Sequence, residues 1–241
     1  MAVPLESVRF ASASDRSLLI YLGDRIAPET HIGIHKLLRL LELDPIAGIR
    51  NLHPAYCSLL VQFDPLCLEH DLLEAVLRRY VGRLGEIHLP EPRQVEIPVC
   101  YSEDVALDLH DVAALHNLAA ADVVELHSSA RYSVYFLGFV PGFAYLGGLP
   151  KELATPRLAK PRLSVPSGSV GIGGEQTGIY PFATPGGWRV IGRTPLAMFL
   201  PQRRQMSLLA IGDSVRFTPI SFRRFSELEV AGGVDSEDGR R

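Results

Sequence analysis

The residues best suited to chemistry lie in one stretch rich in glycine and proline, from Leu137 to Pro195. Glycine lets the backbone approach a ligand and proline fixes the backbone, so such a stretch is typical of rigid, ordered loops. Polar and aromatic side chains occur throughout it, namely Arg157, Arg162, Ser167, Gln176, Thr177, Tyr180, Trp188 and Arg193. Polar groups that converge beside aromatic surface are what a pocket for a small ligand requires. The sequence therefore predicts a small-ligand site within this stretch.

A purely structural interpretation of the same stretch stays open. Gly and Pro at the corners of a barrel can serve turns alone. Phe139, Phe143 and Tyr145 can equally belong to a hydrophobic core. Composition by itself does not choose between loops that bind a ligand and loops that only connect strands.

Several familiar catalytic motifs are missing from the sequence. It contains no GxxxxGK[ST] P-loop, and the segment from Gly171 to Gln176 fails the GxGxxG pattern at its last position. An ATP site in this chain would therefore need another arrangement. Ser167 lacks the preceding glycine that a GxSxG nucleophile requires, so the sequence gives a serine nucleophile little support.

The isolated histidines and acids carry weaker signals. His110 and His116 are not spaced as a zinc motif, which favours solvated helix residues. His127 lies on the same predicted helical face as Val123, so the default interpretation is a half-buried, hydrogen-bonded histidine. Glu175 is a better candidate for ligand contact than an acid in an ordinary turn, yet no acid or base is assigned.

Composition bounds the class of protein. The chain has 241 residues, 47% hydrophobic and 21% charged, with a formal net charge of −3. It is long enough for one large domain or two small ones, and its charge gives no general attraction to nucleic acid or anionic lipid. The cysteines Cys57, Cys67 and Cys100 form neither a CxxC pair nor a disulfide framework. With no secretion leader and no membrane-spanning apolar run in view, we expect a cytoplasmic location.

The first 93 residues predict a small α/β sandwich. Extended pieces over 8–22 precede a helix with Thr30 as its cap, a strand over 53–63 and a second helix over 68–80. Prolines between Pro90 and Pro98 then disfavour regular structure. We therefore predict an N-terminal domain over 1–93, a second domain over 94–225 and a flexible tail over 226–241.

The second half predicts many short strands. A strand over 95–101 and helical patches over 108–118 and 121–128 come first. Short hydrophobic runs then alternate with Gly and Pro, at 132–139, 164–165, 169–172, 188–191, 196–199 and 214–220. Such a pattern is typical of a barrel or a sandwich. The predicted fold class is α+β.

Several long motifs carry a family resemblance. They are HPAYCSLLVQFDP at 53–65, LHS at 126–128, YSVYFLGFVPGFAYLGGLP at 132–150, TPRLAKPR at 155–162, VPSGSVGI at 165–172, QTGIYP at 176–181 and PGGWRVIGRTP at 185–195. With these motifs the chain resembles the KipI/PxpB family, also called allophanate hydrolase subunit 1, and one part of the carboxyltransferase region of urea carboxylase. The resemblance implies a cyclophilin-like β-barrel as the second domain. A shared barrel does not by itself imply prolyl isomerase activity.

The resemblance also implies an activity and partners. It points to the PxpB-type subunit of an ATP-dependent 5-oxoprolinase, which hydrolyses 5-oxo-L-proline to L-glutamate together with PxpA-type and PxpC-type subunits. ATP is the implied cofactor, and its site can lie in a partner rather than in this chain. Two alternatives stay open: a KipI-like inhibitor that binds a sensor histidine kinase, and, with less support, a fragment of urea carboxylase.

On this hypothesis each candidate side chain has a role. Arg162 and Arg193 bind a carboxylate or phosphate, since guanidinium groups do so in a planar, bidentate way. Hydrogen bonds from Ser167, Gln176 and Tyr180 orient the ligand, and Phe143 and Trp188 form an apolar wall. The full set of predicted binding residues is His127, Phe143, Arg162, Ser167, Gln176, Tyr180, Trp188 and Arg193.

Overall fold

A computed structural model describes residues 8–237, with side chains described as far as residue 231. A first compact unit ends at Glu91 and a second begins at Pro92. This division lies two residues before the boundary predicted after residue 93. Independent folding of either unit stays a prediction.

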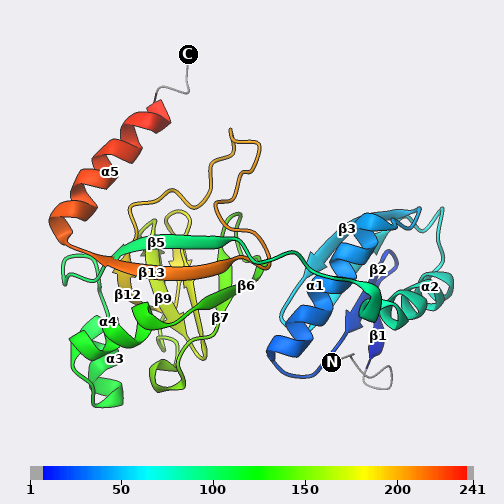
Figure 1. Ribbon diagram of the computed structural model, residues 1–241, viewed down its shortest axis with the longest axis horizontal. Helices are drawn as coiled ribbons and strands as arrows, with labels where there is room; N and C mark the ends of the chain where they lie inside the picture. The colour runs from blue at the N-terminus through cyan, green and yellow to red at the C-terminus, as the bar shows by residue number, and fades with distance from the viewer. Residues whose placement is uncertain (1–7, 238–241) are drawn as a thin grey trace. The chain divides into compact units, whose positions relative to one another are not determined.

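The first unit is a four-stranded antiparallel sheet with two α-helices. The strand order is β1-β2-β4-β3, from Arg9–Ser14, Ser17–Tyr21, Ser58–Phe63 and Ile49–Pro54. The helices are α1 (Pro28–Leu43) and α2 (His70–Gly82), followed by the short η2 (Leu84–Glu86), and Figure 1 shows α1 lying across the sheet. Leu59, Val61 and Phe63 alternate along β4 and are buried, as expected for one covered face. The core of this unit lies between that face and the helices.

Two details of the first unit correct the sequence-based expectations. Helix α1 begins at Pro28 after Ala27, so Thr30 lies inside the helix and does not cap it. Proline suits the first helical position because its missing N–H needs no partner there. The strand predicted over 53–63 is instead a hairpin, in which β3 ends at Pro54 and the N–H of Ala55 donates to the carbonyl of Ser58 at 2.8 Å.

The second unit is a closed seven-stranded barrel. Its order is β10-β7-β6-β13-β5-β12-β9, with β9 paired to β10 to complete the ring. The strands are β5 (Gln94–Cys100), β6 (Tyr132–Leu137), β7 (Ala144–Gly147), β9 (Ser169–Gly173), β10 (Gln176–Ile179), β12 (Arg189–Arg193) and β13 (Ser214–Ile220). β13 runs parallel to β5, and the other pairings are antiparallel. The predicted α+β fold class is confirmed.

Helices and a small ribbon surround the barrel. Helices α3 (Leu109–His116) and α4 (Ala120–Ser129) pack against each other and against β12 and β13 (Figure 1). The short η3 (Lys151–Leu153) leads towards β8 (Arg162–Val165), which pairs with β11 (Thr184–Gly186) outside the ring. The interior is filled by apolar side chains such as Val134, Ile172 and Phe217, all buried. A barrel this narrow is a packed core, so a ligand site must lie outside it.

Three local predictions in this unit need comment. The run over 196–199 forms no strand in the described chain and has only an isolated bridge from Phe199 to Ser207. The strands β7 and β10 were missing from the prediction because both are short and contain glycine. Helix α5 (Phe222–Glu237) occupies most of the stretch predicted as a flexible tail. Residues 238–241 of that prediction lie outside the described residues.

Candidate functional site

An aromatic pocket of about 230 Å³ lies on the outside of the barrel. It is lined by Phe139, Phe143, Tyr145, Arg157, Pro161, Tyr180, Pro185, Gly186, Gly187 and Trp188. Three of these, Phe143, Tyr180 and Trp188, belong to the predicted set of binding residues. We call this cavity the aromatic pocket.

Phe143 organises the walls of the aromatic pocket. Its ring meets Tyr180 edge-to-face at 5.2 Å and Trp188 edge-to-face at 5.5 Å between centroids. Tyr145 lies 4.8 Å from Phe143 and 5.8 Å from Trp188. Edge-to-face pairs are favoured because the positive ring edge faces the negative ring face. The four rings therefore hold one another in fixed orientations.

Glycines let these rings lie close to the strands. Val170 and Ile172 of β9 point into the barrel core, so Gly171 and Gly173 face outward. A Cβ on Gly173 would lie 2.5 Å from Nε1 of Trp188, closer than real atoms approach. The indole ring thus rests directly on the backbone of β9. This contact explains why the glycine-rich stretch serves a site as well as turns.

Arg157 supplies the charge of the aromatic pocket. Its guanidinium carbon lies 5.8 Å from the centroid of the Trp188 ring, within the range of a cation–π contact. Among the described residues that line the pocket, it alone carries a formal charge. In the described part of the chain, no carboxylate lies within ion-pair distance of Arg157. The pocket therefore has a cation that no carboxylate of the described residues neutralises.

Two tyrosine hydroxyls add hydrogen-bonding groups to the walls. Burial raises the pKa of Tyr145 and of Tyr180 above the usual value, and the charge of Arg157 partly opposes both shifts. Both phenols consequently stay protonated near neutral pH. Tyr180 also interacts with the backbone N–H of Trp188, which lowers its pKa by a smaller amount than burial raises it. The pocket thus combines flat apolar walls with O–H groups and one guanidinium.

Arg162 is engaged by a carboxylate of its own chain. Its two terminal nitrogens donate to the two oxygens of Asp108 at 2.9 and 2.6 Å. Asp108 is 3% exposed and also accepts the backbone N–H of Val190 at 2.7 Å. This fork joins β8 to the loop before α3 and to β12. Arg162, predicted to bind the carboxylate or phosphate of a ligand, thus binds the carboxylate of Asp108 in this structure.

Arg193 and Ser167 lie together but away from the lining residues of the aromatic pocket. Nε of Arg193 donates to the carbonyl of Ser167 at 2.7 Å, and its terminal nitrogen pairs with Glu229 of α5 at 2.8 Å. The hydroxyl of Ser167 donates to the carbonyl of Pro181 at 3.0 Å. Gln176 is half-buried at the start of β10 and is not among the lining residues. The structure does not gather these three predicted residues at the pocket.

His127 lies in the barrel core. The hydroxyl of Thr177 donates to the carbonyl of Gly171 at 3.0 Å, so towards Nε2 of His127, at 3.1 Å, it acts as the acceptor. Nδ1 then accepts the hydroxyl proton of Tyr101 at 2.8 Å. Complete burial lowers the pKa of His127 to about 3, which keeps the ring neutral. The histidine is more buried than the half-buried residue predicted, and it bonds to two hydroxyls.

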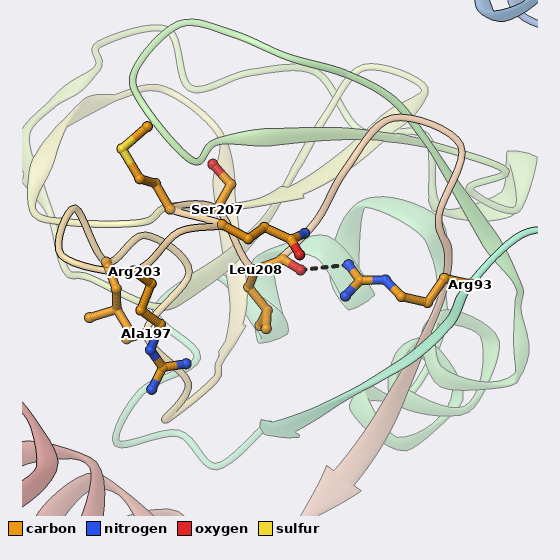
Figure 2. Close-up of a pocket in the computed structure, with 8 residues that line it drawn as sticks. Arg93, Ala197, Arg203, Ser207 and Leu208 are labelled. Atoms are coloured by element: carbon orange, nitrogen blue, oxygen red, sulfur yellow. Dashed lines mark hydrogen bonds between the residues drawn. The ribbon is translucent and has the colours of Figure 1, made fainter. Parts of the chain in front are cut away.

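Two further cavities contain none of the predicted residues. One, of about 280 Å³, lies beside the 197–208 loop of the second unit (Figure 2). There Arg93 donates to the carbonyl of Leu208 at 2.7 Å and pairs with Asp213, while Arg203 reaches the cavity from the loop. The other, of about 410 Å³, lies in the first unit, where Arg50 pairs with Asp64. We take the aromatic pocket as the candidate site because, of these three cavities, it is the one lined by predicted binding residues.

The described residues show neither a metal centre nor a membrane span. Within 8–237, no three His, Cys, Asp or Glu side chains cluster in a way that could hold a metal ion. In the same range, no helix is long and apolar enough to cross a bilayer.

Sequence reasoning underestimated two residues of the aromatic pocket. Arg157 stood in the predicted polar set without a role, and Tyr145 was left open as a core residue. Spacing along the chain gave no means to bring Arg157 to the indole of Trp188. The sequence does carry one signal, because Trp188 is its single tryptophan and follows two glycines.

Comparison with known proteins gives the family. Residues 8–209 match the family described as "Carboxyltransferase domain, subdomain C and D". The chain is 42% identical over 217 residues to the B subunit of 5-oxoprolinase from Bacillus subtilis, covering 86% of this chain and 90% of that protein. It is 51% identical over 156 residues to the B subunit of 5-oxoprolinase from Escherichia coli O157:H7, covering 65% of this chain and 71% of that protein.

Solved structures agree with this assignment. The crystal structure of TTHA0988 superposes with a TM-score of 0.75 at 34% identity, covering 86% of this chain, and this chain spans only 40% of that one. The crystal structure of Kluyveromyces lactis urea carboxylase, with a TM-score of 0.78 at 21% identity over 95% of this chain and 23% of that one, shares the fold. On the match to residues 8–209 and the identities to two proteins of the same name, the chain belongs to the 5-oxoprolinase B-subunit family of carboxyltransferase C and D domains.

Proposed function

We propose that this chain is the PxpB-type subunit of an ATP-dependent 5-oxoprolinase, a complex that hydrolyses 5-oxo-L-proline to L-glutamate. The observation that carries the proposal is the 42% identity to the Bacillus subtilis 5-oxoprolinase protein, over 90% of its length. The aromatic pocket supports it, because a small flat ring that bears a carboxylate suits its aromatic walls and its guanidinium.

The chain's own part in the reaction is to bind and orient. Three residues of the predicted set line the pocket and are proposed to contact the substrate, namely Phe143, Tyr180 and Trp188. For Arg162 we propose a positioning role, since its fork to Asp108 fixes β8 next to the pocket. Correct orientation of a bound substrate is a large part of catalysis, because it replaces the improbable encounter of freely moving reactants.

The residues of the aromatic pocket do not fit ATP. The pocket, at about 230 Å³, lies below the range of about 300–1,000 Å³ typical of sites for larger ligands. A triphosphate with its metal ion also needs several cationic or backbone donors and a carboxylate for the metal. Arg157 is the single charged residue among those that line this pocket in the described chain. We therefore propose that a partner subunit, and not the aromatic pocket of this chain, binds ATP.

Partner subunits of the PxpA and PxpC types complete the proposed complex. This chain spans 40% of TTHA0988 and 23% of the urea carboxylase structure, so its fold occurs within longer chains that carry further parts. Two relatives of this chain are named B subunits of 5-oxoprolinase, and that name implies further subunits. We also propose a cytoplasmic location, in line with the three free cysteines.

Reconstitution tests the proposal. The chain is co-expressed with the PxpA-type and PxpC-type subunits of its own genome, and glutamate formed from 5-oxo-L-proline is measured with and without ATP. We expect glutamate only when all chains and ATP are present. Unchanged glutamate formation after omission of this chain would refute the proposal, and the kinase-inhibitor alternative would then be tested by binding to a sensor kinase.

A further inference from the structure

We infer that Arg157 is the residue that selects the carboxylate of the substrate, while the rings of Trp188, Phe143 and Tyr180 enclose its five-membered ring. This inference rests on the proposed function for the identity of the ligand. It assigns a specificity role to Arg157, for which the sequence predicted none. Arg162 and Arg193, the arginines predicted for this task, bind Asp108 and Glu229 instead.

The first argument concerns charge. Arg157 is exposed and lines the pocket without a carboxylate partner in the described chain, so its guanidinium favours an anionic ligand there. Arg189 shows the contrast, since it lies on β12 next to Trp188 in the sequence and pairs with Asp111 at 3.5 Å. The guanidinium of Arg157, in contrast, lies over the ring of Trp188. The pocket therefore favours an anion, and the carboxylate of the proposed substrate meets that preference.

The second argument concerns shape. The rings of Phe143, Tyr180 and Trp188 are fixed edge-to-face at 5.2 and 5.5 Å, with Pro161 and Pro185 also lining the cavity. Rigid, flat surfaces bind planar rings well because little conformational freedom is lost on binding. A five-membered lactam is nearly planar and has apolar edges. The volume of the pocket, about 230 Å³, suits such a small molecule.

The third argument concerns the lactam amide. Tyr180 lines the cavity, and its hydroxyl can donate its O–H proton to a ligand carbonyl. Gly186 and Gly187 line the same cavity with backbone alone; the Gly187 carbonyl accepts the N–H of Leu158 at 2.7 Å and has a second lone pair for a ligand N–H. The pocket thus offers partners for each polar group of 5-oxo-L-proline.

The chain carries its own reporter for a direct test. Trp188 is the single tryptophan, so intrinsic tryptophan emission comes from the wall of this pocket. The full-length chain is titrated with 5-oxo-L-proline, and also with 2-pyrrolidinone, which lacks the carboxylate, and with acetate, which lacks the ring. We expect a saturable change in emission with 5-oxo-L-proline at much lower concentration than with either fragment.

The variants are chosen as a matched pair. Arg157→Ala removes the proposed carboxylate-binding group, and Arg203→Ala removes another exposed arginine that lines a different cavity of the same unit (Figure 2). We expect the Kd for 5-oxo-L-proline to rise about tenfold or more in Arg157→Ala, as a lost charge-assisted hydrogen bond predicts, and to stay unchanged in Arg203→Ala. The Kd for 2-pyrrolidinone should be the same in all three proteins.

Each outcome decides the inference. A Kd for 2-pyrrolidinone equal to that of the wild type shows that the ring pocket of Arg157→Ala is intact, and Arg157→Lys, which keeps the charge without the fork, should bind 5-oxo-L-proline with intermediate affinity. Absence of a saturable change in the wild type, or equal Kd values for the two alanine variants, would overturn the inference. If glutamate formation by the complex persisted in that case, the proposed function would stand without it. Saturable binding of 5-oxo-L-proline without glutamate formation by the complex would support the inference and refute the proposed function.

Discussion

Acidification is expected to destabilise the barrel unit through one buried histidine. His127 is fully buried, stacks on Phe217 at 4.5 Å and hydrogen-bonds to Tyr101 and Thr177. Burial lowers its pKa from 6.5 to about 3 in the folded state. In the unfolded chain the same ring takes up a proton near its ordinary pKa. Stability is therefore fully present above about pH 6.5 and is lost as the pH falls towards 3.

The size of this effect follows from the two pKa values. Between about pH 7 and 5 the unfolded state gains about 0.7 proton at this position, whereas the folded state gains almost none. Since one pH unit in this range corresponds to about 1.4 kcal/mol, the free energy of unfolding should fall by about 2 kcal/mol. That loss is a large fraction of the stability of an ordinary domain, about 5–15 kcal/mol.

The assay is urea unfolding followed by the emission of Trp188, which reports on the barrel unit. Wild type and His127→Phe are compared at about pH 7 and 5. The phenylalanine keeps the stacking on Phe217 but cannot titrate. Between the two pH values, the free energy of unfolding should therefore fall about 2 kcal/mol less in His127→Phe than in the wild type. An equally steep loss of stability in His127→Phe would refute the assignment. His31, whose pKa is lowered to about 4 mainly by burial, lies in the other unit and does not affect this comparison.

Three further predictions concern groups around the pocket. Asp108→Asn should destabilise the barrel by about 3 kcal/mol in urea unfolding, at the lower end for a broken buried pair because Arg162 is partly exposed; a loss below about 1 kcal/mol would contradict the fork. Gly173→Ala should displace the indole and shift its emission, at a cost of about 1–3 kcal/mol, whereas Gly85→Ala, whose methyl meets nothing within 4 Å, should leave emission unchanged. Arg193→Ala should speed hydrogen exchange of helix α5 without altering ligand affinity, and unchanged exchange would contradict the link to Glu229.

Periodicity and turn residues predicted most of the architecture. The apolar spacing of Ile34, Leu37 and Leu41 identified α1, and short runs broken by Gly and Pro identified the barrel class. The errors occurred where local signals were ambiguous. A largely apolar run from His53 to Phe63 concealed a tight hairpin. The closure of the ring through β7 and β10 depends on pairings between distant segments that no local pattern specifies.

The residue types of the candidate site could be predicted from the sequence, but not which arginines line it. Phe143, Tyr180 and Trp188 do share one cavity, because glycines on β9 and Gly186 at the end of β11 leave room for their rings. The arginines could not be sorted from the sequence, since Arg157, Arg162 and Arg193 have the same residue type and similar Gly- and Pro-rich surroundings. Their roles depend on whether Asp108, Glu229 or no carboxylate lies opposite in the described chain, which only folding decides.

The most direct test of this account is the KM for 5-oxo-L-proline of the reconstituted complex carrying Arg157→Ala, set against the complex carrying Arg203→Ala. We expect KM to rise about tenfold or more in the first complex, as loss of a charge-assisted contact to the substrate carboxylate predicts, and to match the wild type in the second. Equal KM values in the two complexes, or an active complex that does not contain this chain, would contradict the account.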